Sequence, residues 1–543
     1  MACDAGSAGV SPAPQRGKAA AVAFTDDCGR DVRAPRACAW RNYGKTMPTI
    51  HKEKMTNRNQ KPLDFSRREF FSRFTDGLHG SALAWLLGRD LFSANASLAF
   101  GLQEGPGSYD LKPKPAHFSS RAKSVIHLFM NGGPSQVDLF DPKPTLSKFA
   151  GTAPPRDIVS EIEFANEVGS LLPSPFKFSK HGKSGIEVSE LLPHLSECID
   201  DIALIRSMYG EHFNHEPSLY LMHSGRTLPG RPSLGSWVVY GLGSENQNLP
   251  AYVVLDDPKG TPINGIQNWQ SGWLPPVYQG TRFRSEGPAL LNLKAREELP
   301  TPLVEAQRSL LHRLDEAHMQ RRPRQPELEA RISNYELAAR MQITATDALD
   351  LSQESEQTKE MYGLNQELTS SYGRRCLMAR RLVERGVRFV QIYIEAQIWD
   401  AHSDLEKSLR YSCGKTDKPA AALLKDLKQR GLLDSTLVIW GGEFGRMPLS
   451  QVRDNAASAG RDHGPSGFSL WMAGGGVKGG VAHGSTDDLG HKAVENKVSV
   501  HDFHATMLHL LGMNYRDLIY ERHGLNERLT DQFPARVISE ILV

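Results

Sequence analysis

The sequence is poor in the features that define several large classes of protein. Only six cysteines occur among 543 residues, and no pair has CxxC spacing. A disulfide framework or a thiolate zinc site is therefore not expected. Basic and acidic residues nearly balance, 64 against 62, so charge does not favour nucleic acid as a partner. No apolar run reaches the roughly 18–20 residues that a membrane-spanning helix needs, so no integral membrane span is expected.

A nucleotide-binding loop is also missing. The glycines at 474–476 and 479–480 lack the G-x-x-x-x-G-K-[ST] spacing of a phosphate-binding loop. We interpret them as residues that let the backbone turn tightly after a strand. The overall composition, 39% hydrophobic and 23% charged, is that of an ordinary globular protein.

The first hundred residues contain what resembles an export signal. An arginine pair at 67–68 is followed by an apolar stretch at 78–87 and by an A-x-A sequence at 94–96. This order resembles a twin-arginine signal peptide, which we place at residues 55–96. An amphipathic N-terminal helix is the alternative interpretation.

About 65 residues precede the arginine pair, whereas such signals normally begin near the start methionine. We therefore expect translation to start at Met55 or Met47. Residues 1–54 are then a disordered leader or a start-site error. Export by this route would place the mature protein in the periplasm or outside the cell.

Short apolar segments alternate with helical patterns in the rest of the chain. Strands are predicted at 124–130, 202–206, 388–394, 436–440 and 468–473. Helices are predicted at the start of 186–206, through most of 302–385, and at 419–430 and 500–511. Residues 249–300, rich in glycine, proline and tryptophan, are predicted to be irregular loops.

This alternation predicts an α/β fold with a mostly parallel sheet covered by helices on both faces. Ligands of such sheets bind at the carboxyl ends of the strands. We expect one domain over residues 120–543, with residues 302–385 as a largely helical insertion.

Acidic and imidazole side chains cluster at the ends of the predicted strands. The candidates are Asn131, Ser135, Asp138 and Asp141 after the first strand, Asp400 and His402 after the strand at 388–394, Glu443 and Arg446 after the strand at 436–440, and Asp462 and His463 before the strand at 468–473. Carboxylates and imidazoles together bind zinc or another divalent ion, which polarises an ester oxygen. Taken singly, Asp400-x-His402 also fits a capped turn, and Glu443 also fits an ion pair with Arg446.

Several motifs together resemble one known family. They are SVIHLFMNGGPSQVDLFDPKP, YELAARMQ, RRLVERGVRFVQIY, WDAH, GGEFGRMP, GRDHGPSGFSLWMAGGGVKGG and DFHATMLHLLG. The chain resembles the family catalogued as domain of unknown function number 1501 from about residue 122 to the C-terminus. That family is placed in the alkaline phosphatase and sulfatase-like superfamily. The resemblance implies an alkaline phosphatase-like α/β/α sandwich with a metal site at the strand ends.

The resemblance also implies metal ligands. Asp400, His402 and His463 look like the ligands of the superfamily's first metal. Glu443 resembles the acid of its second metal, but Phe444 stands where a histidine is usual. Asn131 stands where an aspartate would complete that second site. The implied cofactor is a divalent metal, zinc first, with calcium or magnesium as alternatives.

The position of the superfamily's nucleophile is changed in this chain. The stretch NHEPSLYLMHSGR resembles the C/S-x-P-S-R sequence of sulfatases. His215 occupies the nucleophile position and Leu219 the arginine position, so the formylglycine mechanism is excluded on this alignment. His215 is then a histidine nucleophile, a metal ligand or a relic, and Ser135 and Ser218 are weaker candidates for the nucleophile.

Arg446 has two interpretations. Its guanidinium matches the oxygens of a phosphate or sulfate, so it is a candidate for binding the substrate anion. A structural salt bridge is the alternative.

Two functions remain open at this point. The first is an exported metal-dependent hydrolase of phosphate or sulfate esters, acting on an anionic ester or a sulfated polysaccharide. The second is a non-catalytic protein of the same fold that binds a polysaccharide or a cell-surface partner. In the second case Trp269, Trp273 and Tyr278 would stack against sugar rings.

Overall fold

The computed structural model describes residues 110–160, 162, 168–287, 289–290, 300–322, 325–451 and 458–543. The expected leader and the twin-arginine signal lie outside these residues. All described residues belong to one unit that spans residues 78–543.

A nine-stranded sheet lies at the centre of this unit. Its strands are β1 (Ser124–Phe129), β5 (Ile202–Tyr209), β6 (Tyr252–Leu255), β7 (Thr281–Phe283), β8 (Phe389–Tyr393), β9 (Thr436–Gly441), β13 (Phe468–Ala473), β14 (Val481–His483) and β17 (Val498–Ser499). They run in the order β14-β5-β13-β9-β1-β8-β6-β7, with β17 also beside β5. β13 is antiparallel to both neighbours, and the other described pairings are parallel.

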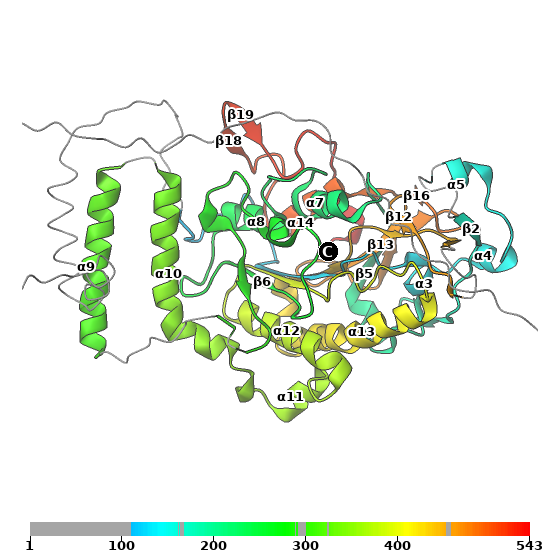
Figure 1. Ribbon diagram of the computed structural model, residues 1–543, viewed down its shortest axis with the longest axis horizontal. Helices are drawn as coiled ribbons and strands as arrows, with labels where there is room; N and C mark the ends of the chain where they lie inside the picture. The colour runs from blue at the N-terminus through cyan, green and yellow to red at the C-terminus, as the bar shows by residue number, and fades with distance from the viewer. Residues whose placement is uncertain are drawn as a thin grey trace, which may run out of the picture. The chain divides into compact units, whose positions relative to one another are not determined.

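Helices cover both faces of the sheet, as Figure 1 shows. The helices on one face are α12 (Glu367–Glu384) and α13 (Leu405–Gln429), and those on the other are α7 (His215–Ser224), α8 (Leu234–Leu242) and α14 (Val500–Leu510). Alternate side chains of β1 enter opposite cores: Ile126 and Leu128 pack with α12 and α13, whereas Val125 and Phe129 pack with the other three helices. The fully buried pattern of β1 follows from this two-sided cover. The predicted α/β/α sandwich is therefore confirmed.

The predicted helical region is helical. It contains α9 (Thr301–Gln320), α10 (Pro326–Leu349), α11 (Glu356–Met361) and α12. α9 and α10 lie side by side (Figure 1), and the Arg308 guanidinium donates to the Ala339 carbonyl across them. α10 and α12 both contribute apolar side chains to the core on one face of the sheet.

Smaller elements lie around the sheet. They are α3 (Gln136–Leu139), α4 (Pro144–Lys148), α5 (Arg156–Ser160), the paired strands β2 (Val168–Leu171) with β11 (Leu449–Gln451), β10 (Gly445–Arg446) with β12 (His463–Gly464), β15 (Ser485–Thr486) with β16 (Ala493–Glu495), and β18 (Tyr520–Arg522) with β19 (Leu525–Glu527). The cysteines at 198, 376 and 413 are buried free thiols, as expected.

Three local predictions were wrong. The start of residues 186–206 forms β4 (Ile186–Ser189), paired with β3 (Phe178–His181), and a short α6 (Pro193–Ser196) rather than one helix. Pro193 lacks a backbone N–H and occupies the first turn of α6, so the helix begins there. Residues 249–300 contain β6 and β7, two strands of the central sheet, and not only loops. α13 begins at Leu405, fourteen residues before the predicted start, and Pro419 lies inside it.

The five predicted strands and the last helix are all present, within a few residues of the expected bounds. In the described part of the chain, none of the helices combines the length and the apolarity needed to cross a bilayer.

Candidate metal centre

The carboxyl ends of β8, β1 and β9 lie next to one another. Phe129 at the end of β1 is level with Tyr393 of β8 and with Gly441 of β9. Because the three strands are parallel, the loops that follow them leave the sheet at the same edge. These loops carry Asp400, His402, Glu443 and Arg446. The parallel pairing of the three strands therefore brings these side chains to the same edge of the sheet.

Asp400 is the centre of this rim. Its Oδ1 atom lies 2.9 Å from His402 Nε2 and 3.1 Å from His463 Nε2. The two Nε2 atoms lie 3.0 Å from each other. One carboxylate oxygen and two imidazole nitrogens therefore converge on a single point.

His463 reaches this point through a short antiparallel pair. It lies in β12, directly opposite Arg446 of β10. The loop that carries Asp400 lies close to the turn after β1, because Gly132 has no side chain to keep it away. A Cβ atom on Gly132 would lie 2.7 Å from the backbone nitrogen of Asp400, and the φ of Gly132 is +110°. The Gly-Gly turn after β1 thus allows the close contact between the first strand's end and the Asp400 loop.

His215 connects Asp400 to Glu443. It begins α7 and is buried, with its ring between the two carboxylates. Its Nδ1 donates to Glu443 Oε1 at 2.7 Å, and its Nε2 lies 3.4 Å from Asp400 Oδ2. The Gly132 backbone N–H also donates to Glu443 Oε1, at 2.9 Å. We call Asp400, His402, His463, His215 and Glu443 the Asp400 cluster.

Two polar atoms of the Asp400 cluster are buried without a hydrogen-bond partner in the described structure. They are Glu443 Oε2 and His215 Nε2. Glu443 is only 2% exposed, so water does not freely solvate its second oxygen. A buried carboxylate oxygen with no donor is costly unless a cation or an ordered water occupies the space next to it.

The charges of the cluster shift its protonation. Burial lowers the pKa of His215, but contacts with Asp400 and Glu443 outweigh burial and raise that pKa to about 9. Burial raises the pKa of Asp400, yet its contacts with the three imidazoles and with Arg446 hold that pKa well below its usual range. Burial lowers the pKa of His463 to about 4, against the opposing effect of Asp400. At neutral pH the protein without metal therefore holds a charged Asp400 and a protonated His215.

Arg446 is used entirely within the protein. It is 0% exposed, and its Nη2 donates to Asp400 Oδ1 at 2.5 Å. The same guanidinium donates to the carbonyls of Gly132, Gly133 and Arg461. The structural salt bridge, rather than an open anion site, is the interpretation that this geometry supports. Arg446 fixes the Asp400 carboxylate relative to the turn after β1.

The residues after β1 are engaged elsewhere. Asn131 Nδ2 donates to the Ile394 carbonyl at 3.0 Å, and the Ile394 N–H donates to Asn131 Oδ1 at 3.2 Å. Both functional groups of this amide therefore tie β1 to β8. Ser135 Oγ donates to Asp138 Oδ2 at 2.5 Å, and that carboxylate makes a fully buried two-pronged pair with Arg461.

The other predicted nucleophile is engaged as well. Ser218 Oγ donates to the His212 carbonyl at 2.7 Å. Of the candidate nucleophiles, the structure thus brings His215 into the cluster and holds Ser135 and Ser218 to other partners.

The donor set fits a divalent metal. Ligands of a tetrahedral zinc ion, each about 2.0–2.1 Å from the metal, lie roughly 3.3 Å from one another. Three atoms, Asp400 Oδ1, His402 Nε2 and His463 Nε2, lie 2.9 to 3.1 Å from one another, which is close to that spacing. His402 Nδ1 donates to Gln451 Oε1, which leaves the Nε2 lone pair facing the point of convergence.

Two overlapping groups of possible ligands share His463. One is His215, Asp400 and His463, and the other is His402, Asp462 and His463. Asp462 Oδ1 accepts the backbone N–H of His463 at 2.8 Å, so it also holds that loop in place. Gln451 and Arg461 were not predicted from the sequence, because neither belongs to a pattern of ligands and both act through other residues.

The aromatic residues suggested for sugar stacking are not available. Trp269 and Tyr278 are buried in the core beside α7 and α8. Trp273 is only partly exposed, and its ring stacks on Tyr520 at 5.4 Å between centroids. Trp269 packs against Tyr393 and Tyr278 packs against Tyr240, so these rings pack within the protein rather than form an open platform for sugar.

Residues 122–542 match the family described as "Protein of unknown function (DUF1501)". The comparison with curated proteins gives no match. Among solved structures the chain is similar to the PsFucS1 sulfatase from Pseudoalteromonas sp., with 11% identity and a TM-score of 0.31 over 72% of this chain and 68% of that chain. It is also similar to a mutant of TAB5 alkaline phosphatase with bound magnesium, with 12% identity and a TM-score of 0.29 over 73% of this chain and 99% of that chain. The residues matched by the family contain the whole central sheet and the Asp400 cluster.

Proposed function

The chain belongs to the DUF1501 family, and we propose that it is an exported, metal-dependent hydrolase of phosphate or sulfate esters. The observation that supports this most is the position of Asp400. One of its oxygens lies within 3.1 Å of two imidazole nitrogens, and the other lies 3.4 Å from a third. The whole arrangement lies at the carboxyl ends of parallel strands, where ligands of such sheets bind.

Asp400, His402 and His463 are the residues proposed to hold the metal. A divalent ion bound there would polarise an ester oxygen and activate a water molecule. Gln451 and Arg446 are positioning residues in this proposal: the first fixes the ring of His402, and the second fixes the carboxylate of Asp400. Zinc suits two imidazoles and a carboxylate, which makes it the first metal to test.

We propose that His215 presents its Nε2–H to an oxygen of the anionic ester. That nitrogen lies 3.4 Å from Asp400 Oδ2 and makes no shorter contact with an acceptor in the described structure, and in the metal-free protein the raised pKa of His215 keeps the ring protonated at neutral pH. A protonated imidazole has no free lone pair, so this role fits the geometry better than attack by His215 on the ester. Glu443 holds the ring from the other side.

The proposed substrate is an anionic ester, with a sulfated polysaccharide as the natural class. The proposed site of action is the periplasm or the exterior, reached by the twin-arginine route. N-terminal sequencing of the exported protein tests the route. Cleavage near the A-x-A sequence at 94–96 supports it, and recovery of the mature protein with residues 1–40 attached contradicts it.

The activity is tested with aryl phosphate and aryl sulfate esters and with metal analysis of the same samples. The variant is the pair His402→Ala, His463→Ala. The matched control is the pair His312→Ala, His318→Ala, two exposed histidines of α9. We expect the control to keep metal and turnover and the variant to lose both. If the native protein binds metal but hydrolyses neither ester, the result would favour the non-catalytic binding role.

A further inference from the structure

A cavity lies beside the end of β7, at the same edge of the sheet as the carboxyl ends of β8 and β1. β7 follows β6, and β6 follows β8 across the sheet, all three parallel. Phe283 at the end of β7 is level with Leu255, which is level with Ile392 of β8. Adjacent strands lie 4.7–4.9 Å apart, so the end of β7 is about 10 Å across the sheet from the end of β8.

The cavity begins where the chain leaves β7. Its volume is about 1040 Å³, and Arg284 and Ser285, which follow β7 directly, form part of its wall. The remaining wall comes from residues 287, 289 and 290, from residues 349–365, and from Arg374 and Met378 of α12. We call it the β7-end cavity. Its size matches that of ligand sites in proteins, which span about 300–1,000 Å³.

The lining of the β7-end cavity has the chemistry of a sugar site. Its apolar part consists of Leu290, Leu349, Leu351, Leu364 and Met378. Arg284 and Arg374 are donors, Asp350 and Glu360 are acceptors, and Asn365 is both. The acidic and basic side chains balance, so the lining does not select a ligand by net charge. A pyranose ring has apolar C–H faces and hydroxyls that both donate and accept, and it matches each of these features.

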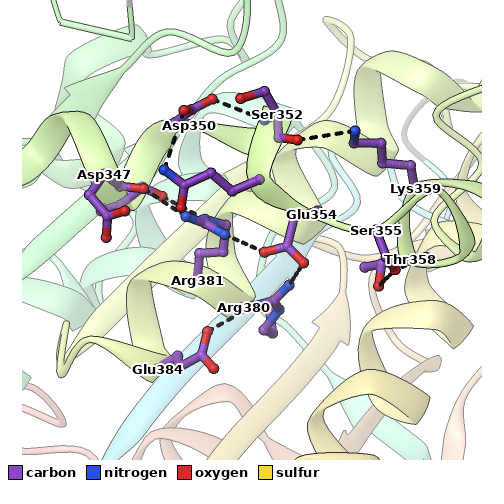
Figure 2. Close-up of polar contacts among 12 residues, drawn as sticks. Asp347, Asp350, Ser352, Glu354, Ser355, Thr358, Lys359, Arg380, Arg381 and Glu384 are labelled. Carbon is purple, nitrogen blue, oxygen red and sulfur yellow. Dashed lines mark hydrogen bonds and ion pairs between the residues drawn. The ribbon is translucent and has the colours of Figure 1, made fainter.

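Buried ion pairs connect the chain segments that supply part of the cavity's wall, and Figure 2 shows these pairs. Glu354 pairs with Arg380 at 2.7 Å and with Arg381. Arg381 also donates to the carbonyls of Asp347 and Ala348, which ties α12 to the last turn of α10. Lys359 donates to the Ser352 carbonyl across the cavity's edge. A site formed before the ligand arrives loses little affinity to ordering its own side chains.

We infer that the β7-end cavity binds a sugar unit of a saccharide chain whose ester group is held at the Asp400 cluster. The binding of the ester group at the Asp400 cluster rests on the proposed function. The binding of a sugar unit in the β7-end cavity depends only on the residues of that cavity. The cavity would then select a saccharide chain over a small aryl ester.

The experiment uses a sulfated galactan hexasaccharide and the same hexasaccharide after chemical desulfation, with binding measured by calorimetry. The variant is Glu360→Ala, Arg374→Ala, two exposed residues whose loss leaves the net charge unchanged. The matched control is Arg536→Ala, Glu540→Ala, an exposed ion pair near the C-terminus. Both variants are also assayed on an aryl ester.

We expect the desulfated hexasaccharide to bind the variant about tenfold more weakly than the native protein, a loss of about 1.4 kcal/mol. The control and the His402→Ala, His463→Ala protein should bind it as the native protein does. Turnover of the aryl ester should not change in the Glu360→Ala, Arg374→Ala protein. The aryl ester assay therefore distinguishes a failure of the proposed activity from a failure of sugar binding in the cavity. Equal binding by variant and native protein, or no binding of the desulfated chain at millimolar concentration, would overturn the inference.

Discussion

The Nε2 atoms of His402 and His463 lie 3.0 Å apart, although 61 positions separate the two residues in the chain. Each is also within 3.1 Å of the same oxygen of Asp400. Two imidazole nitrogens within hydrogen-bond distance of each other and of one carboxylate oxygen also make up a donor set that suits a divalent metal.

The first prediction concerns the link between Glu443 and His215. The change Glu443→Gln removes a negative charge whose nearest oxygen is 2.7 Å from His215 Nδ1. An imidazolium that loses a carboxylate partner becomes less stable, so the pKa of His215 should fall from about 9 by one unit or more. NMR titration of the imidazole resonances in metal-free protein measures this. Glu197→Gln, an exposed acid, is the control, and an unchanged pKa in Glu443→Gln would contradict the contact.

The second prediction concerns the ring of His402. Gln451→Ala removes the acceptor of the His402 Nδ1 hydrogen bond without touching a proposed metal ligand. Residues that orient metal ligands in this way typically contribute about 10–100-fold to affinity. We expect zinc to bind Gln451→Ala weaker by about that factor, measured by competition with a chelator of known affinity. Gln353→Ala, an exposed glutamine in the wall of another cavity, should bind zinc as the native protein does. If the Gln451→Ala protein bound zinc as tightly as the native protein, the hydrogen bond between His402 Nδ1 and Gln451 would not orient the His402 ring.

The third prediction concerns stability. Asp138 and Arg461 are both 0% exposed. Arg461 Nε donates to Asp138 Oδ2 at 2.7 Å, and Arg461 Nη2 donates to Asp138 Oδ1 at 3.0 Å. Asp138→Asn leaves the guanidinium buried without its charge partner, which should lower the free energy of unfolding by about 3–5 kcal/mol. Glu406→Gln breaks an exposed pair with Arg410 and should cost less than about 1 kcal/mol. Urea unfolding of the two variants separates these outcomes, and similar small losses in both would contradict the buried pair.

The fourth prediction concerns acid. Burial lowers the pKa of His223 to about 4 and that of His504 to about 3, and it holds the pKa of His127 well below 6.5. The unfolded chain therefore binds more protons than the folded chain between about pH 6.5 and pH 4, so stability must fall as pH falls through this window. Each histidine contributes up to about 1.4 kcal/mol per pH unit.

His504→Gln tests this directly. The glutamine retains a donor for the Met222 carbonyl that His504 Nε2 contacts at 2.8 Å, but it does not titrate. The slope of unfolding free energy against pH should become shallower by about 1.4 kcal/mol per unit near pH 5. An unchanged slope would mean that His504 is protonated in the folded protein.

The sequence predicted much of the sheet because its buried strands are short apolar runs that end in polar loops. All five predicted strands are present. Parallel pairing brings the carboxyl ends of β1, β8 and β9 together, and the antiparallel β13 brings the loop before it, which carries His463, to the same edge. β6 was missed because only four residues, Tyr252–Leu255, form it, between a proline and two aspartates. Its stability comes from pairing with β7 and β8, which local sequence does not reveal.

The proposed ligands were predictable from the sequence, but the residues that support them were not. The sequence predicts Asp400, His402 and His463 as metal ligands, and the structure brings these three side chains together, while their role as ligands stays a prediction. The role of Arg446 was ambiguous in the sequence, because an arginine near an acid suits a substrate site as well as a buried pair. Only its burial and its three carbonyl partners decide the matter.

The most direct test of the account is zinc stoichiometry in the purified mature protein. We expect about one equivalent or more in the native protein and in the His312→Ala, His318→Ala control. We expect its loss in the His402→Ala, His463→Ala protein, with circular dichroism showing that all three remain folded. Equal zinc in all three proteins, or none in the native protein after growth in zinc, would contradict a metal centre at Asp400.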